Sequence, residues 1–244
     1  MIARLHRPDL FLCVLKDMLE SATPLSVRQL ANRLGVNKHT IWRWRMLALK
    51  FFPMSADPHL AGILEADETY QRESRKGSRE WVRHFADPAA FPAPPRPRWK
   101  DYSTMGLPKK RGLSRWQLPI LTVADRSGAR FLKRIPDRKP STIEGCLLPL
   151  VPSDAILCSD KASAYSNSAK TLGVEHFTVG SKPGERIKNG CFHIQNVNSL
   201  HAQYKRFIRL FRGPATKYLD GYIGWLEARL GKMTAKTALQ ISLS

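Results

Sequence analysis

The sequence predicts an α/β protein: a mixed sheet flanked by helices and preceded by a small all-α helix-turn-helix domain. Three observations predict it. Short apolar runs alternate with helical patterns from residue 62 to residue 230, as in a sheet with helices packed on it. Residues 1–50 carry only helical patterns. The 244 residues, 43% of them hydrophobic, can bury a core in one large domain or two modest ones.

The first domain is assigned to residues 1–52. Pro8 suits a first helical position, and apolar residues follow it at helical spacing. Ser26 can cap a second helix that ends at Gly35, and Asn37 can cap a third that runs to residue 50. Two helices joined by a turn that contains glycine have the layout of a helix-turn-helix.

The third helix of this domain carries the candidate DNA contacts. Its polar side chains suit phosphates and the edges of bases in a major groove. The candidates are Lys38, His39, Thr40, Arg43 and Arg45. Residues 1–50 hold nine Lys and Arg against three Asp and Glu, which favours DNA binding. The alternative is a three-helix packing unit that binds nothing.

The second domain is assigned to residues 60–230. Strands are expected at residues 62–69, 117–124, 129–135, 155–159 and 174–179. Helices are expected at residues 141–150, 161–172, 193–211 and 215–230. The turn at residues 125–128 makes the second and third strands a hairpin. Residues 231–244 are expected to be a frayed tail.

Residues 71–115 form a basic, Pro-rich insertion in this domain. They hold twelve Lys and Arg against four Asp and Glu, with no sustained periodicity. We expect a mobile loop, because prolines at six positions forbid a continuous helix. Trp81 and Trp99 among the charges favour contact with nucleic-acid phosphates and bases. The alternative is a solvated linker without a function.

The charge of the chain points to a polyanionic partner. Lys and Arg number 40 and Asp and Glu 20, a formal net charge of +20. Nucleic acid is the expected partner, and an anionic membrane surface is the second choice. No apolar run approaches 18 residues, so no transmembrane span is expected, and no signal peptide is evident. The four cysteines form no CxxC pair, which argues against a zinc site and a disulfide framework and favours a reduced, intracellular protein.

Two carboxylates stand at the ends of expected strands. Asp67 ends the first strand and Asp160 follows a later one, 93 residues further on. If these strands lie side by side, their terminal carboxylates meet. Carboxylates repel phosphate, but a divalent cation held between them and a phosphate would support phosphoryl transfer. Either aspartate alone is also consistent with a simple turn or cap.

The helix expected from residue 193 has a polar face. Asn198 and Lys205 lie seven residues apart, two turns, and therefore share that face. Gln195 and His201 lie on the same side, while Val197, Leu200 and Tyr204 supply a face to bury. The polar face is either a functional surface or plain solvated surface.

Three segments of the sequence resemble a known family of proteins. The run FHIQNVNSLHAQYKRFIRLFRGPATKYLDGYIGW, with DETY and LCSDKASAY upstream, is similar to bacterial insertion-sequence transposases. The subgroup is the ISXO-type branch of the DDE, or RNase H-like, superfamily, in which Asn can replace the third acidic residue and a helical Lys follows. The resemblance covers residues 2–230.

The resemblance implies an RNase H-like fold for the second domain and a transposase activity. It implies that Asp67, Asp160 and Asn198 bind the catalytic Mg²⁺ ions, with Mn²⁺ as a substitute, and that Lys205 contacts DNA near the site. The implied reaction frees a 3′-hydroxyl at each element end and transfers it to target DNA without a covalent protein intermediate. The implied partners are double-stranded DNA and at least one further copy of the chain, in the bacterial cytoplasm at the nucleoid and not at a membrane.

The sequence differs from the family in one respect, and this difference leaves alternative functions open. Relatives begin with a zinc ribbon, whereas this chain starts at Met1 just where that ribbon would end, as in a truncated copy, an internally started product or a compact member. The alternative function is a catalytically inactive remnant that only binds DNA. A third possibility is an RNase H-like nuclease or resolvase that cuts without joining.

Overall fold

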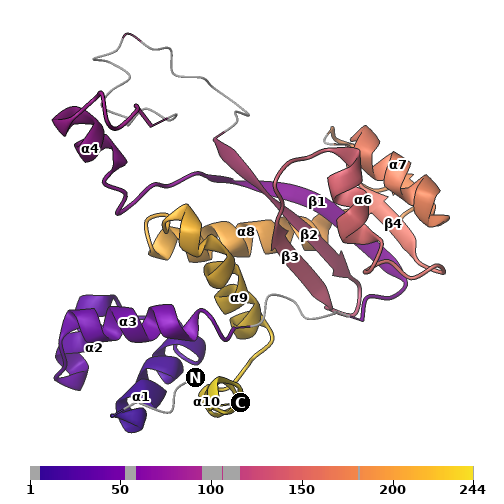
Figure 1. Cartoon of the computed structure of the whole chain (residues 1–244). Helices are drawn as coiled ribbons and strands as arrows, with labels where there is room; N and C mark the ends of the chain where they lie inside the picture. The colour runs from indigo at the N-terminus through magenta and orange to yellow at the C-terminus, as the bar shows by residue number, and fades with distance from the viewer. Residues whose placement is uncertain (1–5, 53–58, 95–105, 107–115, 181, 244) are drawn as a thin grey trace.

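The structure, a computed structural model, describes residues 6–52, 59–94, 106, 116–180 and 182–243. Its centre is a five-stranded sheet in the order β3-β2-β1-β4-β5 (Figure 1). The strands are β1 (Ile63–Arg72), β2 (Gln117–Asp125), β3 (Arg130–Arg134), β4 (Ile156–Ser159) and β5 (Glu175–Thr178). The β3-β2-β1 half is antiparallel, and β4 and β5 join β1 in parallel. The predicted mixed sheet is confirmed, and its strand order and directions are those of the RNase H-like fold.

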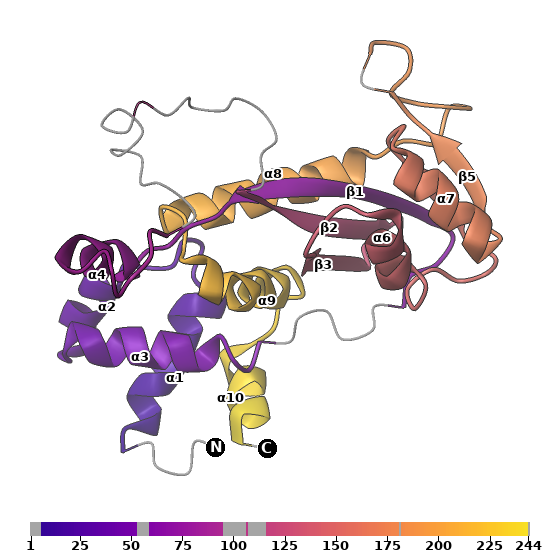
Figure 2. The same ribbon diagram turned by 45° about the horizontal axis from the view of Figure 1, so that its top comes forward.

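Helices cover both faces of this sheet. Helices α6 (Pro140–Leu147) and α7 (Ser163–Leu172) pack on one face, where Leu64 and Ala66 of β1 share a buried cluster with Ile143 and Tyr165. Helix α8 (Gln195–Leu210) lies on the other face and runs along β1 (Figure 2). Alternation along β1 explains this, because successive side chains of a strand point to opposite faces.

The N-terminal region is helical, as expected. It contains α1 (Pro8–Leu19), α2 (Val27–Leu34) and α3 (Lys38–Ala48). Ser26 and Gln29 form a reciprocal capping box at the start of α2. Gly35 ends that helix with a φ of 64°, a conformation that costs little only for glycine. The Asn37 side chain then accepts a hydrogen bond from the His39 amide and starts α3.

These helices share their core with the C-terminal helices. Residues of α1, α2 and α3 belong to the same buried cluster as residues of α8 and α9 (Leu219–Leu230). The fully buried Trp225 of α9 donates its indole N–H to the Met18 carbonyl at 2.7 Å. Arg229 donates to the carbonyls of Met18 and Ser21 and so satisfies groups left open at the end of α1. The contacts fix the N-terminal helices against α9.

Two expected irregular segments contain helices. The expected frayed tail forms α10 (Ala235–Leu243), which contacts α1. That prediction was wrong because Ala235 and Ala238 are buried in the shared cluster, and such tertiary contacts are not visible in a short sequence window. In the basic insertion, β1 continues to Arg72 and α4 (Glu80–Ala86) follows. Trp99 lies outside the described residues. A 3₁₀ turn, η1 (Thr216–Tyr218), precedes α9.

Candidate active site

Asp67 and Asp160 come together at the centre of the sheet. β1 and β4 are parallel neighbours, and their register pairs Ala66 with Ser159. Asp67 directly follows Ala66, and Asp160 directly follows Ser159. The two aspartates therefore occupy equivalent positions beyond the last register pair of the two strands. Their carboxylates interact electrostatically, because Asp160 raises the pKa of Asp67. The two carboxylates are therefore close enough to interact, but Asp67 lies inside β1 and not at its end, so the expectation that it ends the strand was wrong.

The electrostatics of Asp67 favour a cation. Burial is the main reason why the pKa of Asp67 is raised to about 7. The hydrogen bond from the Glu68 backbone amide opposes this rise, and the negative charge of Asp160 adds to it. A half-buried carboxylate next to a second one is stabilised as an anion only if positive charge is supplied.

Helix α8 faces this pair with a histidine. The Nδ1 atom of His201 lies 3.9 Å from an Asp67 carboxylate oxygen. The pKa of His201 is lowered to about 4, first by burial and then by the positive charge of Lys205. His201 is therefore neutral at pH 7 and does not neutralise Asp67. Its buried Nε2 atom has no hydrogen-bond partner among the residues that the structure describes.

Asn198 and Lys205 lie on the same stripe of α8 as His201. Asn198 is one turn before His201, Lys205 is one turn after it, and both side chains are exposed. Among the described residues, Asn198 makes no side-chain hydrogen bond, so its amide oxygen is open to a ligand. Since His201 contacts Asp67, this stripe of α8 faces the two aspartates.

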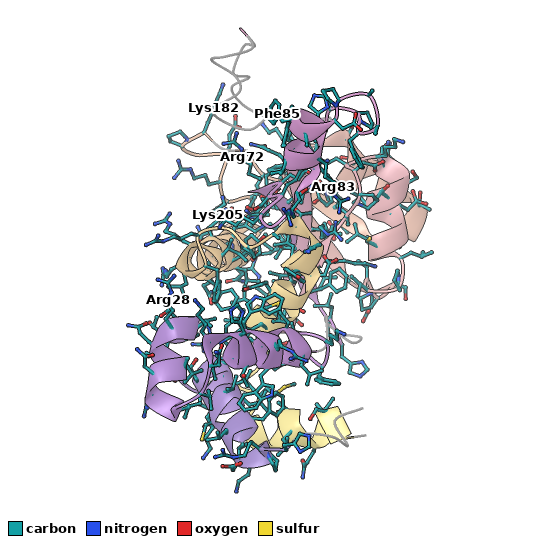
Figure 3. The ribbon with its side chains drawn as sticks, turned by 60° about the vertical axis from the view of Figure 1, so that its left-hand side comes forward. Arg28, Arg72, Arg83, Phe85, Lys182 and Lys205 are labelled. Atoms are coloured by element: carbon teal, nitrogen blue, oxygen red, sulfur yellow. The ribbon has the colours of Figure 1, made fainter. Side chains whose placement is uncertain are left out.

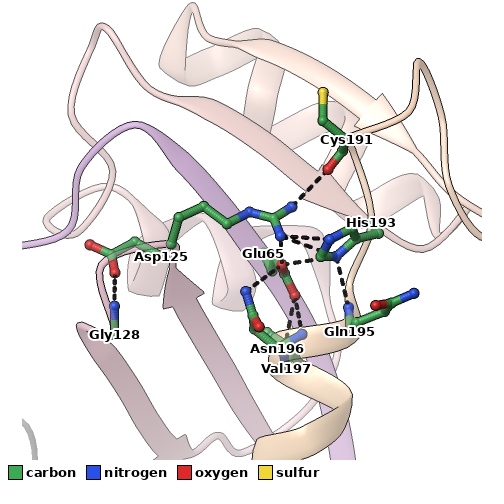
Figure 4. Close-up of polar contacts among 9 residues, drawn as sticks. Glu65, Asp125, Gly128, Cys191, His193, Gln195, Asn196 and Val197 are labelled. Carbon is green, nitrogen blue, oxygen red and sulfur yellow. Dashed lines mark hydrogen bonds and ion pairs between the residues drawn. The ribbon is translucent and has the colours of Figure 1, made fainter.

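Sequence reasoning missed a buried acid, Glu65. It lies two residues before Asp67, on the same face of β1, and is fully buried. Its carboxylate accepts hydrogen bonds from the backbone amides of Asn196 and Val197 at 2.7 and 3.1 Å, and from the Asn196 side-chain amide at 3.0 Å (Figure 4). Glu65 thus caps two amides in the first turn of α8, whose N-cap residue Ile194 supplies no side-chain cap.

Arg126 and His193 complete this cluster. Arg126 lies 3.1 Å from a Glu65 oxygen, donates to the Cys191 carbonyl at 3.0 Å, and lies 2.7 Å from Nε2 of His193. The Gln195 backbone amide donates to Nδ1 of His193 at 3.3 Å, and the same nitrogen lies 3.2 Å from a Glu65 oxygen. No sequence signal pointed to Glu65, because an acid inside a strand pattern gives no hint of its partners.

The candidate DNA contacts of α3 divide into two groups. Lys38, His39 and Arg43 are exposed and Thr40 is half-buried. Arg45 is 5% exposed, donates to Asp17 at 2.7 Å and to the Leu25 carbonyl at 2.7 Å, and packs over Trp225. The expectation that Arg45 contacts DNA is corrected, because its guanidinium is used inside the helical core.

The donor set of the aspartate pair fits a hard divalent cation. Mg²⁺ binds oxygen ligands, keeps several waters and needs only one or two carboxylates from the protein. Asp67 and Asp160 supply the two carboxylates, and the Asn198 amide oxygen is a neutral ligand of the same hard type. Within the described residues, no three His, Cys, Asp or Glu side chains are grouped for metal binding. The fit therefore rests on the aspartate pair and the open amide.

Comparison with known proteins agrees with this geometry. The order and directions of the five strands define an RNase H-like fold. The family model of the ISXO2-like transposase domain matches residues 100–229, more than half of the chain. The chain belongs to this family of DDE transposase domains, which confirms the resemblance.

Similarity to individual proteins is low. A crystal structure of a pre-cleavage Mos1 transpososome matches at 12% identity with a TM-score of 0.27, covering 95% of this chain and 78% of that chain. This similarity is too low to support the fold assignment, which rests on the strand order alone. No curated protein matches the chain. Among the described helices, none is long and apolar enough to cross a membrane.

Proposed function

We propose that this chain is the transposase of an insertion sequence. It cleaves the element ends in a metal-dependent reaction and transfers the freed 3′-hydroxyl to target DNA. The observation that carries the proposal is that Asp67 and Asp160, each one residue beyond the last register pair of the adjacent strands β1 and β4, interact electrostatically. Membership of the transposase family supports it, because the match spans β2 to α9 and includes Asp160 and Asn198.

Asp67, Asp160 and Asn198 would hold Mg²⁺, for which Mn²⁺ can substitute. Bound there, such ions supply Lewis-acid stabilisation of the attacking and leaving oxygens in phosphoryl transfer. The two aspartates hold the charge, and Asn198 contributes an oxygen without adding a third negative charge. Lys205, exposed one turn beyond His201, is placed to contact a DNA phosphate next to the site.

Exposed basic side chains support a DNA-binding surface. Arg28 of α2, Lys205 of α8 and Lys182 lie along one side of the molecule in Figure 3. All three are exposed. A duplex placed along this side would contact both the helical N-terminal region and the surroundings of the aspartates. The net charge of +20 gives such a surface its long-range attraction for DNA.

The organisation of the proposed enzyme follows from this. Residues 1–52 would bind DNA through the exposed residues Lys38, His39 and Arg43 of α3 and the half-buried Thr40. Residues 60–230 would catalyse the reaction. Joining two element ends requires at least two copies of the chain on DNA. A DNA-processing enzyme of this kind works in the bacterial cytoplasm, at the nucleoid.

The test is a cleavage and joining assay on DNA carrying the two sequences that flank the gene. Purified protein is compared with Asp160→Asn in Mg²⁺, in Mn²⁺ and in EDTA. Joined products that disappear in the variant and in EDTA are the expected result. Cleavage without joining would instead identify a nuclease. DNA binding with neither reaction would identify a remnant that only binds DNA.

A further inference from the structure

We propose that Glu65 is a positioning residue that anchors the start of α8 and thereby holds Asn198 in line with Asp67. The inference rests on the proposed function, because it concerns the geometry of the same metal site. It is carried by the contacts of Glu65, which bind the first turn of the helix to the strand that bears Asp67. Figure 4 shows Glu65 with the start of α8 and with His193.

Two contacts fix α8 along β1. Glu65 holds the helix at Asn196 and Val197, and Asp67 lies next to His201. Two strand residues advance by about 6.6 Å. The four or five helix residues between the contacts advance by about 6 to 7.5 Å. The spacings match, so the helix runs in the direction of the strand and a slip of one turn would break both contacts.

Asn198 falls between these contacts. It follows Val197 directly and precedes His201 by one turn. Its exposed side chain makes no hydrogen bond with any residue in the described part of the chain. The position of its amide oxygen therefore depends on the helix backbone, which Glu65 holds through two amides. A rotation of the first turn would carry Asn198 away from the aspartate pair.

Arg126 makes the anchor rigid from the opposite side. It contacts Glu65 and also holds the carbonyl of Cys191, in the loop that leads into α8. The buried Glu65 carboxylate thus has a charged partner, two helix amides and two side-chain partners. Buried polar clusters of this kind restrict the conformation when every member has a partner. The anchor therefore connects β1, the turn after β2 and the start of α8.

The variant that tests the inference is Glu65→Gln. It keeps the shape of the side chain but turns one oxygen into an amide donor that faces the N–H groups of α8. The matched control is Asp125→Asn. Asp125 is also buried and accepts from the backbone amides of Gly128 and Ala129, both at 2.8 Å, but it holds the β2–β3 turn and not α8.

Two measurements separate positioning from general stability. The first is Mn²⁺ affinity of the full-length protein, measured by electron paramagnetic resonance. We expect Glu65→Gln to weaken it at least tenfold and Asp125→Asn to change it less than threefold. The second is amide hydrogen exchange, which should accelerate at residues 196–198 in Glu65→Gln and remain unchanged at residues 204–208.

The link to Asn198 is tested by combining substitutions. If Glu65 acts through Asn198, Glu65→Gln should weaken Mn²⁺ binding less than threefold in an Asn198→Ala background. Fully additive losses would overturn the inference, as would equal Mn²⁺ affinity in Glu65→Gln and wild type. Both results leave the proposed function intact. A wild-type protein that binds no Mn²⁺ would overturn the proposed function and this inference with it.

Discussion

Asp67 and Asp160 are each one residue beyond the last register pair of β1 and β4, Ala66 and Ser159. Parallel pairing thereby places two carboxylates next to each other, and burial with mutual repulsion raises the pKa of Asp67 to about 7. The fold keeps this arrangement although it costs stability in the absence of a cation. Groups whose pKa is shifted by burial and a neighbouring charge are common at binding and catalytic sites.

Asp67→Asn and Asp160→Asn should each abolish metal-dependent cleavage. Each substitution keeps the size of the side chain and removes a charged oxygen ligand. DNA affinity should be unchanged or higher, because negative charge near the phosphates is lost. Gel-shift titration and the cleavage assay on the same preparations check this. Cleavage retained by both variants would contradict the assignment of the metal site.

Asp67→Asn should also stabilise the metal-free protein at neutral pH. The pKa of Asp67 is raised from 3.8 to about 7, so between these values the folded state holds a proton that the unfolded state has released. Stability from this group therefore falls as the pH rises from 4 to 7. The variant should gain about 1–4 kcal/mol above pH 7 and almost nothing at pH 4.

Thermal unfolding in EDTA at several pH values measures this gain. Added Mg²⁺ should raise the melting temperature of the wild type at pH 8 and leave that of the variant unchanged. A gain that is constant from pH 4 to pH 8 would show that the effect does not come from the ionisation of Asp67.

Asn198→Ala should weaken metal binding and cleavage, whereas Asn198→Asp should retain activity. The alanine removes a neutral oxygen ligand, and the aspartate replaces it with a charged one. The Mg²⁺ concentration needed for half-maximal cleavage should rise for Asn198→Ala and stay the same or fall for Asn198→Asp. Wild-type behaviour of Asn198→Ala would remove Asn198 from the ligand set.

Arg43 and Arg45 should behave differently although they are two residues apart. Arg43→Ala should weaken DNA binding and reduce the salt slope by about one, with an unchanged melting temperature, because its side chain is exposed. Arg45→Ala should lower stability by about 3–5 kcal/mol, because it leaves the buried Asp17 without its charged partner. Calorimetry and binding titrations at several salt concentrations distinguish the two.

Much of the fold could be predicted because it depends on local patterns in the sequence. The start of β4 and both ends of α7 were expected to within two residues, since apolar periodicity and Gly173 mark them. Asp67 and Asp160 were identified as candidates from expected strand ends, although β1 continues past Asp67 to Arg72. The helix from Gln195 was expected two residues early, since its true start is set by Glu65, 130 residues upstream.

The sequence alone determined the kinds of elements, their order, the basic charge and the two aspartates. These follow from spacing within a few residues and from composition. Only the tertiary structure decided that Glu65 holds α8, that Arg45 is buried against Asp17, and that residues 235–243 form a helix packed with α1. The physical reason is the same in each case. A buried polar group or a short helix is stabilised by residues far away in the chain, and these residues come into contact only when the chain folds.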